Sequence, residues 1–364
     1  MSHIVIDARI INSTTGRYVE RLIHYLELID KKNNYSILVR KKDLNFYQPS
    51  NRNFKIIEAD FDDYSIQEQL GLKKLLDNLS PDLVHFCMPQ QPILYKGKHI
   101  TTFHDLSLLK TWNSDKNWFI YHFKQLVGKF VFRYVAKSSD HIIAISEYTK
   151  KDLIEFSAVD KNKITVTLES ADTITGRVKS YNQPFKRYIM YVGGQSDYKN
   201  IKRLGDAHQK LLKTNPDLGL ILVGSINDSA KNNKLYFEKN NYKNILFTGF
   251  LPDDQLAYLY KNTKAYVFPS LMEGFGLPPL EAMSYGAPVV SSNYSCLPEI
   301  NGNAAEYFDP LDIDGMAKSI DLVINNRSKS DDLIKKGYKQ IKKYSWDKMA
   351  RQSHEIYMKV LSEK

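Results

Sequence analysis

Residues 265–285 read AYVFPSLMEGFGLPPLEAMSY, and this run gives the clearest prediction of the fold class. The apolar run at 265–268 predicts a buried strand, and the run at 280–285 predicts a helix. Two glycines and two prolines lie between Glu273 and Glu281, which suits a tight turn that opens a helix. A strand that leads through a glycine turn into a helix is the repeating unit of a doubly wound α/β domain.

The same alternation of strands and helices runs along the whole chain. In the first half we predict strands at 4–7, 35–40, 54–58, 83–86, 100–103, 142–145 and 164–166, and helices at 16–29, 66–79, 115–136 and 147–156. In the second half we predict strands at 188–192, 220–223, 245–247, 265–268 and 288–290, and helices at 201–213, 255–261, 280–285, 314–325 and 331–343. The strands are apolar throughout, which indicates parallel sheets covered on both faces.

The pattern lapses once, in a polar stretch without periodicity at 171–186, which we interpret as a linker. We therefore expect one Rossmann-like domain at 1–170 and a second at 187–345, followed by a final helix within 346–364. Most of the glycines lie in the second half, several at strand ends, so the second domain is the better candidate for binding a nucleotide.

Composition places the chain among soluble globular proteins. Its 364 residues suggest about two domains. The first strand begins almost at Met1, and no apolar run approaches the ~20 residues of a membrane span, so we expect neither a signal peptide nor a membrane helix. Cys87 and Cys296 lie far apart and match no metal motif, which favours reduced thiols in the cytoplasm.

The net charge of +10 would fit a nucleic acid, an anionic membrane surface or a phosphorylated substrate. Part of this charge is concentrated in the predicted helix 115–136 and the residues beside it. The basic residues there are Lys116, Lys124, Lys129, Arg133 and Lys137, interleaved with aromatic side chains. Such a helix suits a membrane interface, but it equally suits a helix packed on a sheet with its lysine stems turned outward. Both interpretations stay open.

Glu273 and Glu281 flank the glycine turn, with Gly274, Phe275, Gly276 and Leu277 between them. Carboxylates accept hydrogen bonds from paired hydroxyls, and amides at a helix start bind anions. This stretch resembles the E-x7-E signature of the retaining glycosyltransferases of family 4, which have the GT-B fold. The resemblance implies two Rossmann-like domains facing a cleft, with a C-terminal helix that crosses back to the first domain. It also implies that Glu273 binds the donor sugar and Glu281 the ribose, and that Gly274, Phe275, Gly276 and Leu277 contact the donor.

Three further segments resemble the same family. The loop 193–200 is similar to its G-x4-R-K-N loop, so Gly194 and Lys199 are expected to bind the donor diphosphate, although Tyr198 replaces the usual arginine and leaves Lys202 or Arg203 to supply that charge. His104 follows a strand where the family has a histidine beside the transferred sugar, and Asp105 could orient it. Gly16 and Arg17 lie in a loop expected to face the donor phosphate.

The resemblance implies transfer of a hexose from a nucleotide-diphosphate sugar to a hydroxyl of a saccharide or lipid-linked saccharide, with retained configuration. GDP-mannose is the best guess for the donor, and a UDP-sugar is the alternative. His104, Lys199 and Glu273 would be the catalytic residues. No cofactor and no metal are expected, and the D-x-D pairs at 60–62 and 312–314 are interpreted as loop acids. Two rival classes are a sugar-nucleotide epimerase of the same fold and a non-catalytic basic binding protein. No nucleic-acid partner is expected, whereas an anionic membrane surface would suit an enzyme at the inner face of a membrane.

Overall fold

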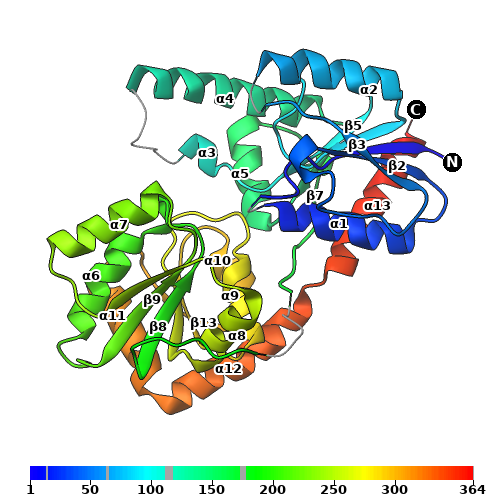
Figure 1. Cartoon of the computed structure of the whole chain (residues 1–364). Coiled ribbons are helices and arrows are strands. Elements are labelled where there is room, and N and C mark those ends of the chain that lie inside the picture. Colours follow the sequence, from blue (N-terminus) through cyan, green and yellow to red (C-terminus); the bar gives the residue numbers. More distant parts are fainter. Residues whose placement is uncertain (14, 63–64, 111–117, 173–177, 364) are drawn as a thin grey trace. The chain divides into compact units, whose positions relative to one another are not determined.

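The computed structural model describes residues 1–13, 15–62, 65–110, 118–172 and 178–363. The chain divides into two compact units. The first contains Met1–Lys110, Ser114–Glu169 and Ser345–Lys364, and the second contains Ser170–Tyr344. Each unit is an α/β body with a parallel sheet and helices on both of its faces (Figure 1).

The first unit is built on a seven-stranded sheet whose described strand pairs are all parallel. Its strands are β1 (His3–Asp7), β2 (Asn34–Val39), β3 (Phe54–Glu58), β4 (Leu83–Phe86), β5 (His99–Phe103), β6 (His141–Ala144) and β7 (Ile164–Val166). They lie in the order β3-β2-β1-β4-β5-β6-β7. The direction of winding reverses between β1 and β4, and such a switch point is where open α/β sheets bind ligands.

Helices cover both faces of this sheet. They are α1 (Gly16–Ile29), α2 (Lys73–Leu79), α3 (Ser107–Lys110), α4 (Trp118–Ser138), α5 (Glu147–Ser157) and α13 (Trp346–Ser362). Two buried clusters form the core beneath α2 and beneath α4 and α5. The side chain of Ser146 accepts a hydrogen bond from the amide of Thr149 and so caps α5, as its position before that helix predicts. Residues 115–117, the start of the helix predicted at 115–136, lie outside the described residues.

The C-terminal helix α13 returns to the first unit, which confirms that expectation. It packs against α1, and the hydroxyl of Tyr357 lies 2.5 Å from Nδ1 of the buried His85 on β4. Asp30, directly after α1, accepts hydrogen bonds from the Tyr35 hydroxyl at 2.7 Å and from Nε2 of His354 at 3.0 Å. Asp30 is 3% exposed, so this carboxylate is an internal tie between α1, β2 and α13.

The tie at Asp30 gives a prediction for stability. Burial alone would raise the pKa of Asp30, but its hydrogen bonds outweigh burial and hold the pKa well below its usual range. The contribution of the ionised Asp30 to the free energy of unfolding is therefore complete above pH ~4, and it is lost as the pH falls further. We expect Asp30→Asn to lower the free energy of unfolding by about 2–4 kcal/mol at pH 7 and by clearly less at pH 3, measured by urea titration. An equal deficit at both pH values would contradict this account.

The second unit has a six-stranded sheet in the order β10-β9-β8-β11-β12-β13, again with parallel pairs. Its strands are β8 (Arg187–Val192), β9 (Leu218–Val223), β10 (Ile245–Gly249), β11 (Ala265–Phe268), β12 (Val289–Ser292) and β13 (Ala305–Phe308). Its helices are α6 (Ile201–Leu211), α7 (Asp228–Lys239), α8 (Asp253–Asn262), α9 (Leu277–Ser284), α10 (Leu297–Asn301), α11 (Ile313–Asn325) and α12 (Arg327–Gln340). The switch point of this sheet lies between β8 and β11, next to the glycine turn.

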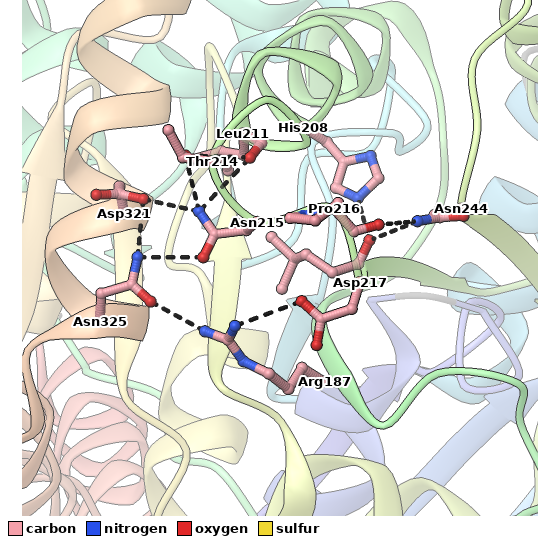
Figure 2. A network of polar contacts seen from close by, with 11 residues as sticks. Arg187, His208, Leu211, Thr214, Asn215, Pro216, Asp217, Asn244, Asp321 and Asn325 are labelled. Carbon is pink, nitrogen blue, oxygen red and sulfur yellow. Dashed lines mark hydrogen bonds and ion pairs between the residues drawn. The ribbon is translucent and has the colours of Figure 1, made fainter.

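A polar network closes the opposite edge of this sheet, at the amino ends of β8 and β9 (Figure 2). Arg187, the first residue of β8, donates to Asn325 at the end of α11 and lies 3.5 Å from Asp217. Asn215, which lies just before β9, donates a hydrogen bond to Asp321 of α11 at 3.0 Å. These polar side chains are hydrogen-bonded to one another, and their bonds hold α11 against the amino ends of the strands.

Candidate functional site

The turn between β11 and α9 places the two carboxylates. Glu273 lies in the turn and Glu281 lies in α9, one turn after its start at Leu277. Gly276 is the N-cap of α9 with φ +93°, a left-handed conformation that favours glycine. A Cβ at this position would also lie 2.7 Å from Cδ2 of Leu297. The backbone conformation therefore favours glycine at this position, and a larger residue would also require the end of the Leu297 side chain to shift.

The start of α9 offers fewer amides than a usual helix start. Pro278 and Pro279 occupy its second and third positions and carry no N–H. The amides of Gly276 and Leu277 are thus the donors that can meet an anion there. Phe275 points inward: it is 3% exposed and packs edge-on against Tyr344 at 5.7 Å. Any contact of Phe275 with a ligand would therefore come from its backbone.

Residues after β12 hold this turn in place from behind. The hydroxyl of Ser295 accepts a hydrogen bond from the Glu273 amide at 3.1 Å. The thiol of Cys296 lies 3.3 Å from the carbonyl oxygen of Glu273 and 3.2 Å from that of Phe275. Cys296 is fully buried, and burial raises the pKa of its thiol well above the usual value. It is thus a neutral donor that supports the backbone of the turn.

The loop after β8 brings Lys199 to the same edge of the sheet. Asp197–Lys199 forms a short 3-10 turn, and Asn200 follows in the left-handed region at φ +62°. The buried side-chain Nδ2 of Asn200 donates to the carbonyl oxygens of Pro269 and Pro310 at 3.1 and 2.8 Å. Through these bonds the lysine loop is fixed to the end of β11, directly before the glutamate turn.

Lys199 and Glu273 form an ion pair. Nζ of Lys199 lies 2.6 Å from Oε1 of Glu273, and the two side chains are 16% and 12% exposed. The ammonium group also lies 4.9 Å from the centroid of the Tyr198 ring. Burial alone would lower the pKa of Lys199, but the carboxylate of Glu273 outweighs burial and raises it above the usual value. The lysine is therefore charged at neutral pH, as binding of a diphosphate would require.

The remaining positions in this loop are less constrained. Gly194 is exposed, and a Cβ there would meet no heavy atom within 4 Å, so packing does not demand a glycine. Lys202 and Arg203 are the candidates for the charge that is missing at Tyr198. Arg203 donates to Asn200 at 3.0 Å, and Lys202 lies 3.9 Å from Asp197. Both lie in the first turn of α6.

His104 lies in the first unit, directly after β5. Its Nε2 is 3.0 Å from the carbonyl oxygen of Cys87, and its Nδ1 is 3.4 Å from Oε1 of Glu169. The edge of the imidazole meets the ring of Tyr18 at 5.0 Å. Glu169 is 4% exposed, and no motif marks it as a site residue, since it lies near the end of the predicted first domain.

Asp105 does not orient His104, contrary to our suggestion. Its Oδ1 accepts hydrogen bonds from the amide and the hydroxyl of Ser107, at 2.8 and 2.6 Å, at the first residue of α3. The carboxylate of Asp105 is engaged by Ser107, and the carboxylate that approaches the imidazole is that of the distant Glu169 instead.

Gly16 and Arg17 open α1 at the carboxyl edge of the same sheet. Gly16 is buried, and a Cβ there would lie 2.0 Å from the backbone oxygen of Ile11, so no larger residue fits without moving the loop. Arg17 is half-buried. Gly16 is thus explained by the packing of the loop itself.

A small polar hollow at the switch point of the first sheet was not predicted. It is lined by Asp7, Arg9, Ile10, Met88 and Gln90. Arg9 pairs with Asp7 and with the fully buried Glu68, each at 2.8 Å. One arginine thus serves two buried carboxylates, and only the three-dimensional structure brings these distant residues together.

The described residues contain no group of three or more histidine, cysteine, aspartate or glutamate side chains that could hold a metal ion. Both D-x-D pairs take part in local contacts. Asp312 accepts from the amide of Gly315 and caps α11, and Asp314 pairs with Lys210 at 2.5 Å. Asp60 accepts a long bond from the amide of Lys41.

Family models match both halves of the chain. One described as Glycosyltransferase Family 4 matches residues 16–173, and one described as Glycosyl transferases group 1 matches residues 176–340. O-antigen chain mannosyltransferase B of Escherichia coli is 31% identical over 276 residues, which cover 71% of this chain and 69% of that protein. The chain belongs to glycosyltransferase family 4.

Two further comparisons describe this glycosyltransferase more fully. The serotype-specific mannosyltransferase WbdA of Escherichia coli is 28% identical over 78% of the chain, but the match spans only 34% of WbdA. The crystal structure of Anabaena Alr3699/HepE with UDP and glucose has a TM-score of 0.74 at 13% identity, and the match covers 99% of this chain and 100% of that one. This likeness confirms the two-domain GT-B fold. No helix in the described part of the glycosyltransferase is long and apolar enough to cross a bilayer.

Proposed function

We propose that this enzyme transfers a hexose from a nucleotide-diphosphate sugar to a hydroxyl of a saccharide or lipid-linked saccharide, with retained configuration. The observation that carries the proposal is the ion pair of Lys199 and Glu273 beside the start of α9. A diphosphate would meet the charge of Lys199 and the amides of Gly276 and Leu277. The lone pairs of Glu273 and Glu281 would accept hydrogen bonds from sugar and ribose hydroxyls.

The proposed chemistry is attack of the acceptor on the face that the leaving diphosphate vacates. Lys199 and the helix amides would stabilise the charge that develops on the diphosphate, while Glu273 orients the sugar. Arg17 and Gly194 keep the donor-contacting roles that the resemblance implies. His104 keeps its implied role as the group that supports the developing charge at the reacting centre. No carboxylate acts as a covalent nucleophile in this proposal.

Mannose from GDP-mannose is the donor that we propose first, and its use would place the enzyme in the synthesis of a cell-surface polysaccharide such as an O-antigen. The support is the similarity to the two Escherichia coli mannosyltransferases. A UDP-sugar is the second candidate, because the GT-B neighbour HepE has been crystallised with UDP and glucose. The proposed location is the cytoplasm, peripheral at the inner face of the membrane, where a lipid-linked acceptor would be met.

A panel of sugar nucleotides tests this proposal. The full-length protein is incubated with GDP-mannose, UDP-glucose, UDP-galactose and ADP-glucose, and slow hydrolysis of each is followed by release of the nucleoside diphosphate. We expect one base to be preferred and α-configured free sugar as the first product. Conversion to an isomeric sugar nucleotide would indicate an epimerase. The absence of both turnover and selective nucleotide binding would indicate a basic binding protein.

We expect the reaction to be independent of divalent metal, because Lys199 and the helix amides can neutralise a diphosphate themselves. Turnover of the preferred donor should change less than about twofold when EDTA replaces Mg²⁺. Loss of turnover in EDTA that Mg²⁺ or Mn²⁺ restores would contradict the proposal and would assign the diphosphate to a bound cation.

A further inference from the structure

Helix α4 of the first unit has exposed apolar side chains on its outward face. On α4 and the neighbouring α3, four apolar side chains are exposed: Leu108 at 54%, Leu126 at 68%, Val127 at 45% and Phe130 at 64%. Nε2 of Gln125 donates to the carbonyl oxygen of Leu108 at 2.8 Å, so the residue from α3 lies beside those of α4. We call these four residues the α4 surface.

The exposed residues of α4 are not part of its packing. Phe132, Val135 and Ala136 point to the other side of the helix, where they are buried in the core with Phe103 and Ile142. Helical spacing places Leu126 and Phe130 one turn apart on the outward side. The helix therefore has a core-facing stripe and, in addition, apolar side chains that remain exposed on its outward side.

The charges around this surface are of one sign. Residues 125–138 contain no acidic residue, and Lys129, Arg133 and Lys137 are all exposed there. Lys96 joins them through the hydroxyl of Tyr134 at 3.2 Å. Two acids of the adjoining α5 have partners of their own, since Asp152 pairs with Lys110 and Glu155 lies 3.9 Å from Lys151.

We propose that the α4 surface inserts into the interface of an anionic lipid bilayer. Apolar side chains with basic neighbours on one face are the pattern of helices that lie in the headgroup region. Lys129, Lys137 and Lys96 would face the anionic headgroups, while Leu126 and Phe130 enter the boundary with the acyl chains. A second copy of the chain fits this surface less well, because self-pairing would bring like charges together.

The α4 surface is a structural feature that would account for the proposed membrane location. The inference rests on the proposed function only in that a lipid-linked acceptor makes membrane docking useful. A membrane-bound enzyme would meet its acceptor by diffusion in two dimensions. The docking can be measured without any sugar nucleotide, so its failure is separate from failure of the transfer reaction.

Co-sedimentation with vesicles tests the inference. The full chain is mixed with phosphatidylcholine vesicles with and without phosphatidylglycerol. We expect binding only to the anionic vesicles, and a partition coefficient lower by at least ~tenfold for the charge variant Lys129→Glu/Lys137→Glu. A similar loss is expected for the apolar variant Leu126→Ser/Phe130→Ser. The matched control Lys335→Glu/Lys339→Glu makes the same charge change on α12 and should bind like the wild type.

Three results would overturn the inference. The first is wild-type binding by both α4 variants, and the second is equal loss in the α12 control, which would indicate attraction by net charge alone. The third is concentration-dependent dimerisation in sedimentation velocity that Leu126→Ser/Phe130→Ser abolishes while vesicles bind nothing, which would assign the surface to a second copy. Circular dichroism of each variant shows whether it is folded, and because all these positions are exposed we expect unchanged spectra.

Discussion

Glu273→Ala is expected to lower kcat/KM for sugar transfer by about a thousandfold while the protein stays folded. The carboxylate has two tasks in the proposed site, because it orients the sugar and it holds the ammonium group of Lys199 at 2.6 Å. Its removal leaves Lys199 mostly buried without this partner. The expected cost in stability is about 1–3 kcal/mol, which a thermal melt would show as a small shift.

A matched control separates lost chemistry from a lost ion pair. Glu306 pairs with Lys329 at 2.6 Å, and these side chains are 22% and 32% exposed, on β13 and α12. Glu306→Ala removes a comparable pair in the same unit, and we expect normal transfer. If Glu273→Ala turned over the preferred donor as fast as the wild type, the carboxylate would have no role in the reaction. If both variants lost activity alike, the effect would be one of stability.

Lys199→Ala is expected to weaken binding of the preferred nucleoside diphosphate by about 10- to 100-fold, measured by titration calorimetry. The lysine is charged because Glu273 raises its pKa, and Asn200 fixes its loop to the end of β11. Removal of one fixed cation should also make the affinity less dependent on salt. The free nucleoside should bind almost equally to the wild type and the variant, since it carries no diphosphate.

Lys210→Ala is the control for this prediction. Lys210 lies on α6 and pairs with the exposed Asp314, so its loss changes the net charge equally but at the surface. We expect unchanged affinity. Unchanged affinity in Lys199→Ala would instead mean that the diphosphate is held by Lys202 or Arg203, or that the loop has another role.

The strands and most helices could be predicted from the sequence because their apolar patterns are local. The strand at 265–268 and the helix at 16–29 begin and end in the structure where the pattern predicts. Helix α7 was missed because it buries only Ala230, Asn233 and Phe237 and is otherwise polar. Strand β13 was missed because it is four residues long, lies at the sheet edge and has Glu306 within it.

The helix predicted at 66–79 shows how a tertiary contact alters a local pattern. Residues 66–79 are helical as predicted, but a π-helical turn at Glu68–Leu72 interrupts the α-helical geometry before α2 begins at Lys73. Glu68 is fully buried and bonded to Arg9 and Gln90 at the switch point of the sheet. A charged residue turned into the core, rather than outward, cannot be read from helical spacing.

The individual groups of the candidate site could be predicted from the sequence, but their partners could not. Glu273, Glu281 and Lys199 lie in short motifs, whereas the pairing of Lys199 with Glu273 joins residues 74 positions apart. The approach of Glu169 to His104 likewise depends on how β5 and the end of the first unit are placed in the fold. Such contacts have no signal in a single sequence, because they arise only when the sheets have formed.

The proposed mechanism depends most on where the donor binds. A crystal structure of the enzyme soaked with its preferred sugar nucleotide tests this directly. We predict the diphosphate within hydrogen-bond distance of Nζ of Lys199 and of the amides of Gly276 and Leu277, with the sugar hydroxyls against Glu273 and the ribose against Glu281. A diphosphate bound away from Lys199 and the 273–281 segment, or held there by a metal ion, would contradict the account.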